Sequence, residues 1–328
     1  MKKILKINIL ILFFMVIANV SYANDEIVTN VMLKEYADSF EPTIYEIQEE
    51  TEFTVFTKNS NETYSITGEE ILAKNIEKYG EENAMRNTTS GYKPNRMKGM
   101  ESNLLLTANP PAYLFNKMNT ETRICRIVVN GLNTATGFLV GPRLLITAAH
   151  VVYDSNTNVN NLAIYPGYNN GQYQGTAPSS VGWTQIYAYP IRLENRLEGY
   201  NNRAYDMAVL ELDWNAGNEY GYYYCQSYGD NQGMNNLYVK EFGYPKLLEE
   251  GRAPYCTAGN ITETYNTYFY TDAVNYEGMS GGPVLRNSDD FAVGCVSSLI
   301  TQGSFSQTFY TYGRRITQDI IDLINSIN

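Results

Sequence analysis

The stretch Gly278-Met279-Ser280-Gly281-Gly282-Pro283 places one serine among glycines and a proline. Glycine takes backbone conformations that a β-carbon resists, and proline sets φ where the chain leaves the turn. Such a turn can present the Ser280 hydroxyl outward and direct the backbone N–H groups of Gly278 and Ser280 toward one point. This arrangement is typical of a nucleophile beside an oxyanion hole, although an ordinary glycine-rich turn has the same composition.

The single histidine of the chain narrows the interpretation of this turn. The stretch satisfies the Gly-x-Ser-x-Gly pattern of the nucleophile elbow in α/β-hydrolases, which place their catalytic histidine after the serine. The only histidine here, His150, precedes Ser280. The chymotrypsin-like order is histidine, aspartate, serine. The order of the residues therefore excludes an α/β-hydrolase esterase.

The surroundings of His150 add a second motif. Gly137–Val140 and Leu144–Ile146 predict a hairpin that delivers His150 at its end. The stretch Thr147-Ala148-Ala149-His150, together with Ser280-Gly281-Gly282-Pro283, resembles the paired signature of trypsin/chymotrypsin-fold serine proteases. The resemblance covers about residues 104–328 and is nearest in style to the bacterial glutamyl-endopeptidase branch.

The resemblance implies an all-β fold of two six-stranded antiparallel β-barrels with a C-terminal helix, preceded by a small propeptide. Barrel one is expected at about 104–222, barrel two at about 223–312, and the helix at 316–327. The 29 tyrosines suit many aromatic strand positions. Apolar residues at helical spacing predict that the last helix docks through one face: Ile316, Ile320, Leu323, Ile324 and Ile327.

The resemblance also implies a catalytic triad, in which Ser280 is the nucleophile and His150 the general base and then acid. Asp206-Met207-Ala208 looks like the family element that leads into a strand, so Asp206 is expected to orient the histidine. Asp154 lies too close to His150 in the sequence to match the pattern, and Asp213 follows the strand. The alternative for Asp206 is an ordinary cap at a strand edge. Gly278 and Ser280 are the expected oxyanion-hole donors.

The same resemblance assigns a supporting residue and a specificity pocket. Ser297 matches the family serine that donates a hydrogen bond to the buried aspartate. Val274 stands at the base of the primary pocket, where an aspartate would select Arg or Lys, and Asn275 follows it. Glutamate specificity in the related branch relies on a pocket histidine, and Val296 occupies that position here. We therefore expect an uncharged residue before the scissile bond, with Glu277 at the pocket rim disfavouring acidic residues.

Met279 and the cysteines depart from the family pattern. Many members place an aspartate at the position of Met279, where it pairs with the new N-terminal amine after activation, and a thioether cannot form that ion pair. Of the four cysteines, none brackets the histidine. Cys295 lies in an apolar segment and is expected to be a buried thiol. Cys225 and Cys256 are expected either to bridge the crossover to barrel two or to remain free.

Residues 1–23 have the pattern of a secretory signal peptide. Three lysines precede the apolar run Ile9–Ile17, which is too short to span a bilayer comfortably, and small residues flank Tyr22 at the end. The expected product is therefore secreted, with no stable membrane insertion after signal cleavage. An uncleaved membrane anchor is the alternative.

Residues 24–103 hold twice as many acidic as basic residues. Phe53–Phe56 and Thr63–Ile66 predict a hairpin, and Thr67-Gly68-Glu69-Glu70 predicts a capped helix that Gly80 ends. The resemblance implies that this segment is a propeptide, and the alternative is an acidic spacer.

The polar stretch Thr88–Asn103 reads as an exposed linker between the propeptide and the protease domain. An activating protease is expected to cut it. A metalloprotease that prefers an apolar residue after the cut would give a chain beginning at Leu104. Arg96 and Lys98 offer a trypsin-like alternative within the same linker.

Composition excludes several classes of function. A net charge of −11 argues against nucleic-acid binding. No cysteine pair has metal-ligand spacing, and one histidine cannot build a His-rich site, so no metal or cofactor is expected. The sequence predicts a secreted serine endopeptidase that cleaves proteins or peptides through an acyl-enzyme. The alternative is an inactive binding or adhesion protein on a protease fold.

Overall fold

The computed structural model describes residues 51–60, 62–80, 84, 89, 115–118, 121–153, 158–173, 180–189, 203–228, 232–302 and 307–328. All of them lie in one compact unit, Ile47–Asn328. The expected signal peptide and the expected cleavage positions lie outside the described residues. Within the described part of the chain, no helix is both long and apolar enough to cross a membrane.

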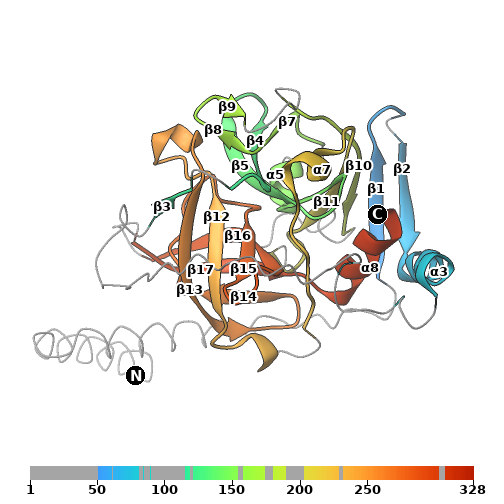
Figure 1. The fold of residues 1–328 in the computed structure, drawn as a ribbon. Coiled ribbons are helices and arrows are strands. Elements are labelled where there is room, and N and C mark those ends of the chain that lie inside the picture. The colour runs from blue at the N-terminus through green and yellow to red at the C-terminus, as the bar shows by residue number, and fades with distance from the viewer. Residues whose placement is uncertain are drawn as a thin grey trace, which may run out of the picture. The chain divides into compact units, whose positions relative to one another are not determined.

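The first half of the described chain forms an eight-stranded antiparallel sheet in the order β2-β1-β10-β11-β6-β5-β4-β7 (Figure 1). The run from β10 to β7 corresponds to the expected barrel one, and Ile164 and Val181 link its two ends through an isolated bridge. Buried side chains such as Ile127, Leu145 and Leu210 fill its interior. The strands are β1 (Glu52–Thr57), β2 (Glu62–Thr67), β4 (Ile124–Val129), β5 (Asn133–Leu139), β6 (Leu144–Thr147), β7 (Leu162–Pro166), β10 (Trp183–Ala188) and β11 (Ala208–Leu212).

The second half forms a closed six-stranded barrel, because β12 pairs with both β15 and β13. The expected chymotrypsin-like fold class is therefore confirmed. Val239, Phe269 and Val296 pack inside this barrel. A short strand, β3 (Asn116–Lys117), joins its outer side through β13. The barrel strands are β12 (Tyr238–Gly243), β13 (Tyr255–Thr264), β14 (Tyr268–Thr271), β15 (Pro283–Arg286), β16 (Ala292–Gln302) and β17 (Gln307–Arg315).

Short elements connect these strands. The small hairpin of β8 (Tyr168–Asn169) and β9 (Gln172–Tyr173) precedes β10, and α7 (Ala216–Tyr220) leads into the crossover between the sheets. Three 3₁₀ turns complete the described connections, at η2 (Arg203–Tyr205), η3 (Gln232–Met234) and η4 (Glu249–Gly251).

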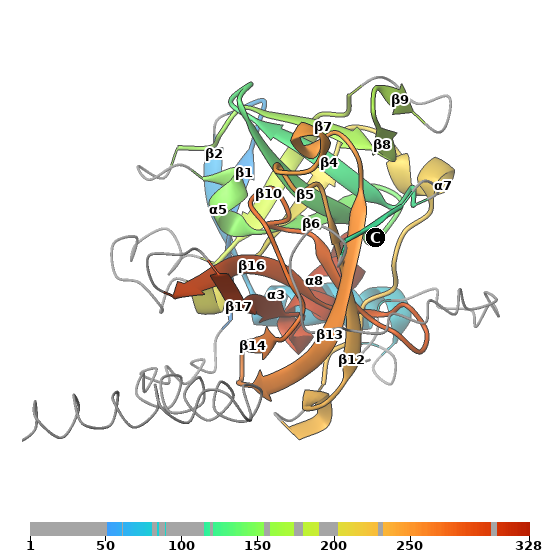
Figure 2. The ribbon, with the colours of Figure 1, turned by 90° about the vertical axis from the view of Figure 1, so that its left-hand side faces the viewer.

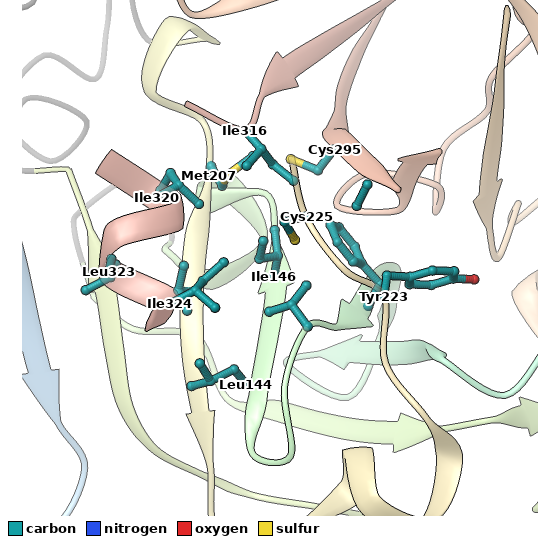
Figure 3. Packing of buried hydrophobic residues seen from close by; sticks show 14 of the residues in the cluster. Leu144, Ile146, Met207, Tyr223, Cys225, Cys295, Ile316, Ile320, Leu323 and Ile324 are labelled. Atoms are coloured by element: carbon teal, nitrogen blue, oxygen red, sulfur yellow. The ribbon is translucent and has the colours of Figure 1, made fainter. Parts of the chain in front are cut away.

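The C-terminal helix, α8 (Gln318–Ile327), is present as expected but begins two residues late. Ile316 donates its backbone N–H to the carbonyl of Val293, so it continues the strand pairing of β17 instead of entering the helix. The apolar face of α8 packs into the core between the two sheets, where Ile324 lies near Ile146 and Ile320 lies near Met207 (Figure 3). The helix therefore belongs to the interface core of the two sheets.

The N-terminal hairpin and helix form as the sequence predicts. Phe53 is paired with Ile66 across the hairpin. Helix α3 (Gly68–Tyr79) has the predicted capping box, in which Thr67 accepts a hydrogen bond from the Glu70 backbone and Glu70 accepts one in return. Gly80 ends the helix with a φ of 76°. Strand β1 pairs with β10, so this part of the expected propeptide shares a sheet with strands of the expected protease domain.

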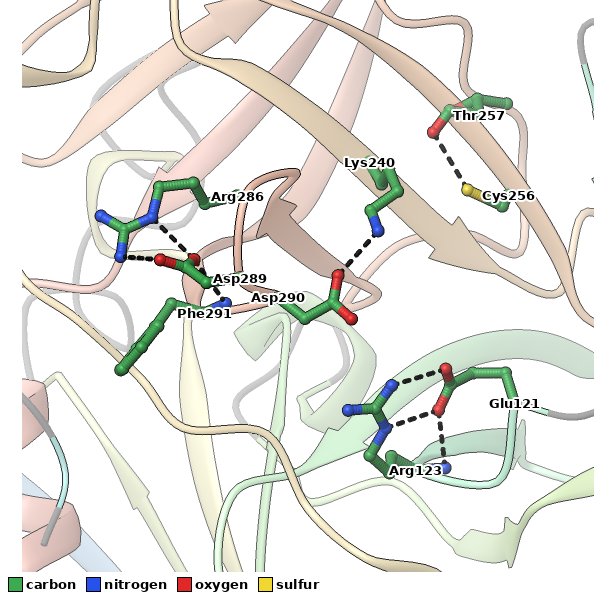
Figure 4. Close-up of polar contacts among 9 residues, drawn as sticks. All are labelled: Glu121, Arg123, Lys240, Cys256, Thr257, Arg286, Asp289, Asp290 and Phe291. Carbon is green, nitrogen blue, oxygen red and sulfur yellow. Dashed lines mark hydrogen bonds and ion pairs between the residues drawn. The ribbon is translucent and has the colours of Figure 1, made fainter. Parts of the chain in front are cut away.

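All four cysteines are buried free thiols. Cys295 is buried as expected, but the possible bridge between Cys225 and Cys256 is not formed. Cys225 lies on the crossover beside Ala292 of β16. Cys256 lies on β13 and donates its S–H to the Thr257 carbonyl at 3.3 Å (Figure 4). Burial raises the pKa of the Cys256 thiol to about 12, so it stays protonated.

Candidate active site

His150 and Asp206 are held together by two neighbouring strands of the first sheet. His150 lies in the one-turn helix α5 (Ala149–Val152) directly after β6, and Asp206 lies two residues before β11, which pairs with β6. Asp206 Oδ2 is 2.7 Å from His150 Nδ1, and Oδ1 accepts the His150 backbone N–H at 2.9 Å. The aspartate side chain is 4% exposed and the histidine side chain 38%. The carboxylate thus orients the imidazole and leaves Nε2 for a reacting group.

Ser297 connects this pair to the second barrel. Its hydroxyl donates a 2.5 Å hydrogen bond to Asp206 Oδ2, and the serine is buried in β16. Asp206 Oδ2 therefore contacts both the imidazole and the Ser297 hydroxyl. The Ser297 hydroxyl thus ties Asp206 to barrel two and holds the carboxylate in the orientation that contacts the imidazole.

Ser280 lies in the turn that leads into β15. Gly281 donates its N–H to the Val296 carbonyl at 2.7 Å, and Val296 donates to the Gly282 carbonyl at 2.8 Å, so the turn is fastened to β16. Gly281 has a φ of +83°, and a β-carbon there would collide with the Thr136 carbonyl. The Ser280 hydroxyl donates a 3.4 Å hydrogen bond to the Ser297 carbonyl. Among the described residues, Ser280 and His150 share no hydrogen bond in this arrangement.

Thr136, on β5, is a structural support of this turn that the sequence analysis missed. Its N–H donates to the Ser280 carbonyl at 2.9 Å, and its hydroxyl donates to the Gly278 carbonyl at 2.7 Å. The same hydroxyl accepts the Tyr244 N–H at 3.0 Å. Thr136 is fully buried, so barrel one directly braces the serine turn of barrel two. No local sequence pattern marks it, because its partners lie more than a hundred residues away.

The peptide between Glu277 and Gly278 has a defined orientation. The Glu277 carbonyl accepts the Lys246 N–H at 2.7 Å. A trans peptide is planar, so the N–H of Gly278 points away from Lys246. Gly278 has a φ of +98°, which only glycine adopts without strain. The assignment of the Gly278 and Ser280 N–H groups as oxyanion-hole donors stays a prediction.

The three expected pocket residues differ in their exposure to solvent. Val274 is half-buried, whereas Asn275 and Val296 are each 1% exposed. Glu277 is 69% exposed at its side chain and pairs with Lys246 at 2.9 Å. Met279 is fully buried, which suits a thioether and not an ion pair.

Glu241, on β12, is a second residue that the sequence analysis missed. It is fully buried, accepts a 2.6 Å hydrogen bond from Thr271 Oγ1, and lies 3.4 Å from Asn275 Nδ2. Burial raises the pKa of Glu241 to about 8, although hydrogen bonds from Thr271, Thr311 and Asn275 lower it in part. The group is therefore a neutral acid at pH 7. The alternation of Val239 and Glu241 along one strand was a usable signal, because it places the carboxyl on the inward face.

No group of three or more His, Cys, Asp or Glu side chains within the described ranges is placed to hold a metal ion. Asp213, considered as an alternative to Asp206, accepts the Gly182 N–H at 3.0 Å. It thus supports the start of β10. Asp154 lies outside the described residues.

The chain is similar to known proteins in both sequence and fold. Residues 135–294 match the family model described as a trypsin-like peptidase domain. The chain is 28% identical over 217 residues to a glutamyl endopeptidase of Bacillus licheniformis, covering 62% of this chain and 63% of the relative. It is 29% identical over 197 residues to an extracellular metalloprotease of Bacillus subtilis, covering 58% and 56%. A solved structure of Glu endopeptidase in complex with MPD has a TM-score of 0.54 at 23% identity, covering 65% of this chain and 95% of its own.

The chain thus spans less than two thirds of the length of either relative. The predicted resemblance to trypsin/chymotrypsin-fold serine proteases of the glutamyl-endopeptidase branch is confirmed. The matched residues include both the His150 and the Ser280 stretches, so the part of the chain that is similar to a trypsin-like peptidase domain contains both motifs.

Proposed function

We propose that this protein is a secreted serine endopeptidase that cleaves peptide bonds through His150, Asp206 and Ser280. The observation that carries the proposal is the two-point contact of Asp206 with His150, at 2.7 Å and 2.9 Å, across the strands that bring the histidine beside the serine turn. A buried carboxylate that fixes one imidazole nitrogen prepares the other to accept a proton.

The reaction follows from the position of each group. The Ser280 hydroxyl attacks the scissile carbonyl while His150 Nε2 takes its proton, and Asp206 stabilises the imidazolium. The N–H groups of Gly278 and Ser280 donate to the developing oxyanion. His150 then protonates the leaving amine, and an acyl-enzyme remains on Ser280. Water, activated by the same imidazole, hydrolyses the acyl-enzyme.

The relatives support the expected location and the class of substrate. The curated relative from Bacillus subtilis is named extracellular, and residues 1–23 have the pattern of a signal peptide. Proteins or peptides are the expected substrates, and an activating protease is expected to cut the linker before Leu104. Neither nucleic acid nor stable membrane insertion is part of the proposal.

Labelling with a fluorophosphonate probe tests the proposed nucleophile. We expect the processed protein to react stoichiometrically at Ser280 and the Ser280→Ala variant to be unlabelled and without proteolytic activity. Ser288→Ala, at an exposed serine of the turn between β15 and β16, serves as the matched control and should retain labelling. Unlabelled but folded wild-type protein would favour the inactive binding protein instead.

Substrate specificity gives a separate prediction. Val274 and Val296 are apolar, Asn275 is neutral, and Glu241 beneath it is protonated at pH 7. A buried substrate charge without a partner costs several kcal/mol in effective terms. We therefore expect cleavage mainly after uncharged residues in a mixed peptide library at pH 7. Dominant cleavage after Glu, or after Arg and Lys, would contradict this pocket assignment.

A further inference from the structure

The N-terminal hairpin is bonded to the protease strands along its backbone. Strand β1 pairs with β10 from Thr54 opposite Ala188 to Thr57 opposite Gln185, and Lys58 N–H donates to the Thr184 carbonyl at 3.0 Å. β10 is the strand next to β1 in the sheet order, so without β1 it would be an edge strand. An exposed edge carries unpaired N–H and C=O groups that attract other strands.

The side chains of the hairpin and helix complete the core between the sheets. Phe53, Val55, Ile66 and Ile71 are each 0–6% exposed and share one buried cluster with the apolar face of α8. The rings of Phe53 and Tyr189 lie 4.9 Å apart. Removing the segment would expose this apolar surface to water, and the free energy of the remaining domain would rise in proportion to the apolar area exposed.

Helix α3 also satisfies polar groups of α8, beside which it lies in both ribbon views (Figures 1 and 2). The fully buried Asn75 donates its amide to the Asp322 carbonyl at 2.9 Å. The Tyr79 hydroxyl donates to the Asn325 carbonyl at 3.1 Å. The last four carbonyls of a helix have no partner within it, so Tyr79 caps one that α8 cannot satisfy itself.

The segment braces the strands that carry the active site. Thr54 is paired with Ala188, which is paired with Ala208, two residues after Asp206. The Phe56 ring lies 5.2 Å from that of Tyr153, the residue that directly follows α5 and its histidine. The segment thus contacts a residue that lies three positions after His150 and pairs with the strand partner of a residue two positions after Asp206.

Anchoring continues beyond the helix into the start of the linker. Thr89 donates its N–H to the Cys225 carbonyl at 3.1 Å and accepts the Cys225 N–H through its hydroxyl at 3.1 Å. Ala84 and Thr89 are 1% and 2% exposed. The expected cleavage positions, Arg96, Lys98 and the bond before Leu104, all follow this last anchor in the sequence.

We propose that residues 51–89 stay bound after the linker is cut, so that the mature protein is a complex of two fragments. The docking surface is the outer edge of β10 together with α8, and its occupant is this chain's own β1–β2–α3 segment. The mature form thereby keeps a strand and a helix that a free domain beginning at Leu104 would lack. The proposal rests on the processing expected under the proposed function.

The test separates retention of the segment from proteolytic activity. The full chain, in the Ser280→Ala background, receives a recognition sequence for a specific protease in place of residues 94–99 and is cut in vitro. Size-exclusion chromatography with light scattering then measures whether the two fragments co-elute, and a denaturing gel shows that both are present. We expect co-elution at equal amounts. Separation of the two fragments of this cut chain would overturn the proposal, whatever the activity of the form that retains Ser280.

A matched pair of variants locates the contact. Val55→Asp places a charge at a fully buried position of β1, and Ser65→Asp places the same charge at an exposed position of β2. We expect Val55→Asp to weaken retention after the cut by about 100-fold or more, and Ser65→Asp to leave it unchanged. The milder Asn75→Ala provides a second measurement if Val55→Asp does not fold, with an expected loss of about tenfold. Equal retention in all three variants would also overturn the proposal.

Discussion

Replacing Asp206 with asparagine should lower kcat by about 10⁴-fold, as in other proteases that use a histidine oriented by an aspartate. The asparagine amide can present its NH₂ to His150 Nδ1, which then carries the lone pair. The proton moves to Nε2, where the base is needed. Ser297 also loses its charged acceptor at 2.5 Å. Steady-state kinetics on a peptide substrate at pH 7 to 9 measures the loss.

The control for this variant is Asp213→Asn, because Asp213 caps Gly182 outside the site. That variant should keep its kcat within a few-fold of wild type, and both variants should melt cooperatively. A kcat of Asp206→Asn within tenfold of wild type would show that Asp206 does not orient the base. In that case the contacts of Asp206 would be those of an ordinary strand-edge cap.

Glu241→Gln should remove much of the loss of stability between pH 4.5 and pH 8. The folded-state pKa of Glu241 is raised from 4.5 to about 8, so between these values the folded state binds more protons than the unfolded state. The contribution of Glu241 to the free energy of unfolding is therefore fully present below pH 4.5 and is lost as pH rises through 8. The whole effect is on the order of 5 kcal/mol, at 1.36 kcal/mol for each pH unit. Glutamine cannot ionise, so its stability should not fall over this window.

Urea unfolding between pH 4 and pH 9, in the Ser280→Ala background to prevent autolysis, measures this effect. Glu249→Gln is the contrasting control, because hydrogen bonds from Lys117, Asn170 and Tyr255 lower the pKa of Glu249 to about 2. The stabilisation from Glu249 is present above pH 4.5 and is lost as pH falls toward 2. Its variant should lose stability at neutral pH and leave the slope between pH 4.5 and 8 unchanged. An unaltered slope over this range in Glu241→Gln would show that Glu241 is not the responsible group.

Several features could be predicted from the sequence, because they depend on interactions between residues that are close together in the chain. The glycines around Ser280 predict a turn with positive φ values that glycine adopts without strain. In the structure, Gly278 and Gly281 do have positive φ. The Thr67–Glu70 capping box and the Gly80 cap involve residues at most four apart, so the helix between them was predictable. The order of His150, Asp206 and Ser280 was enough to separate one class of hydrolase from another. None of these inferences needed the position of a distant strand.

Other features could not be predicted, because they depend on contacts between residues that are far apart in the sequence. Thr136 and Glu241 act on residues that the chain brings near them from other strands, and a side chain's partner across a sheet leaves no local trace in the sequence. The hairpin of β1 and β2 was predictable, but which sheet edge it joins was not, since any unpaired strand offers the same backbone groups. The hairpin joins β10 because its apolar side chains pack there against Tyr189 and α8. In the same way, the positions of Cys225 and Cys256 in the sequence were compatible with a bridge, and the structure shows both thiols buried and free, with Cys256 donating to the Thr257 carbonyl.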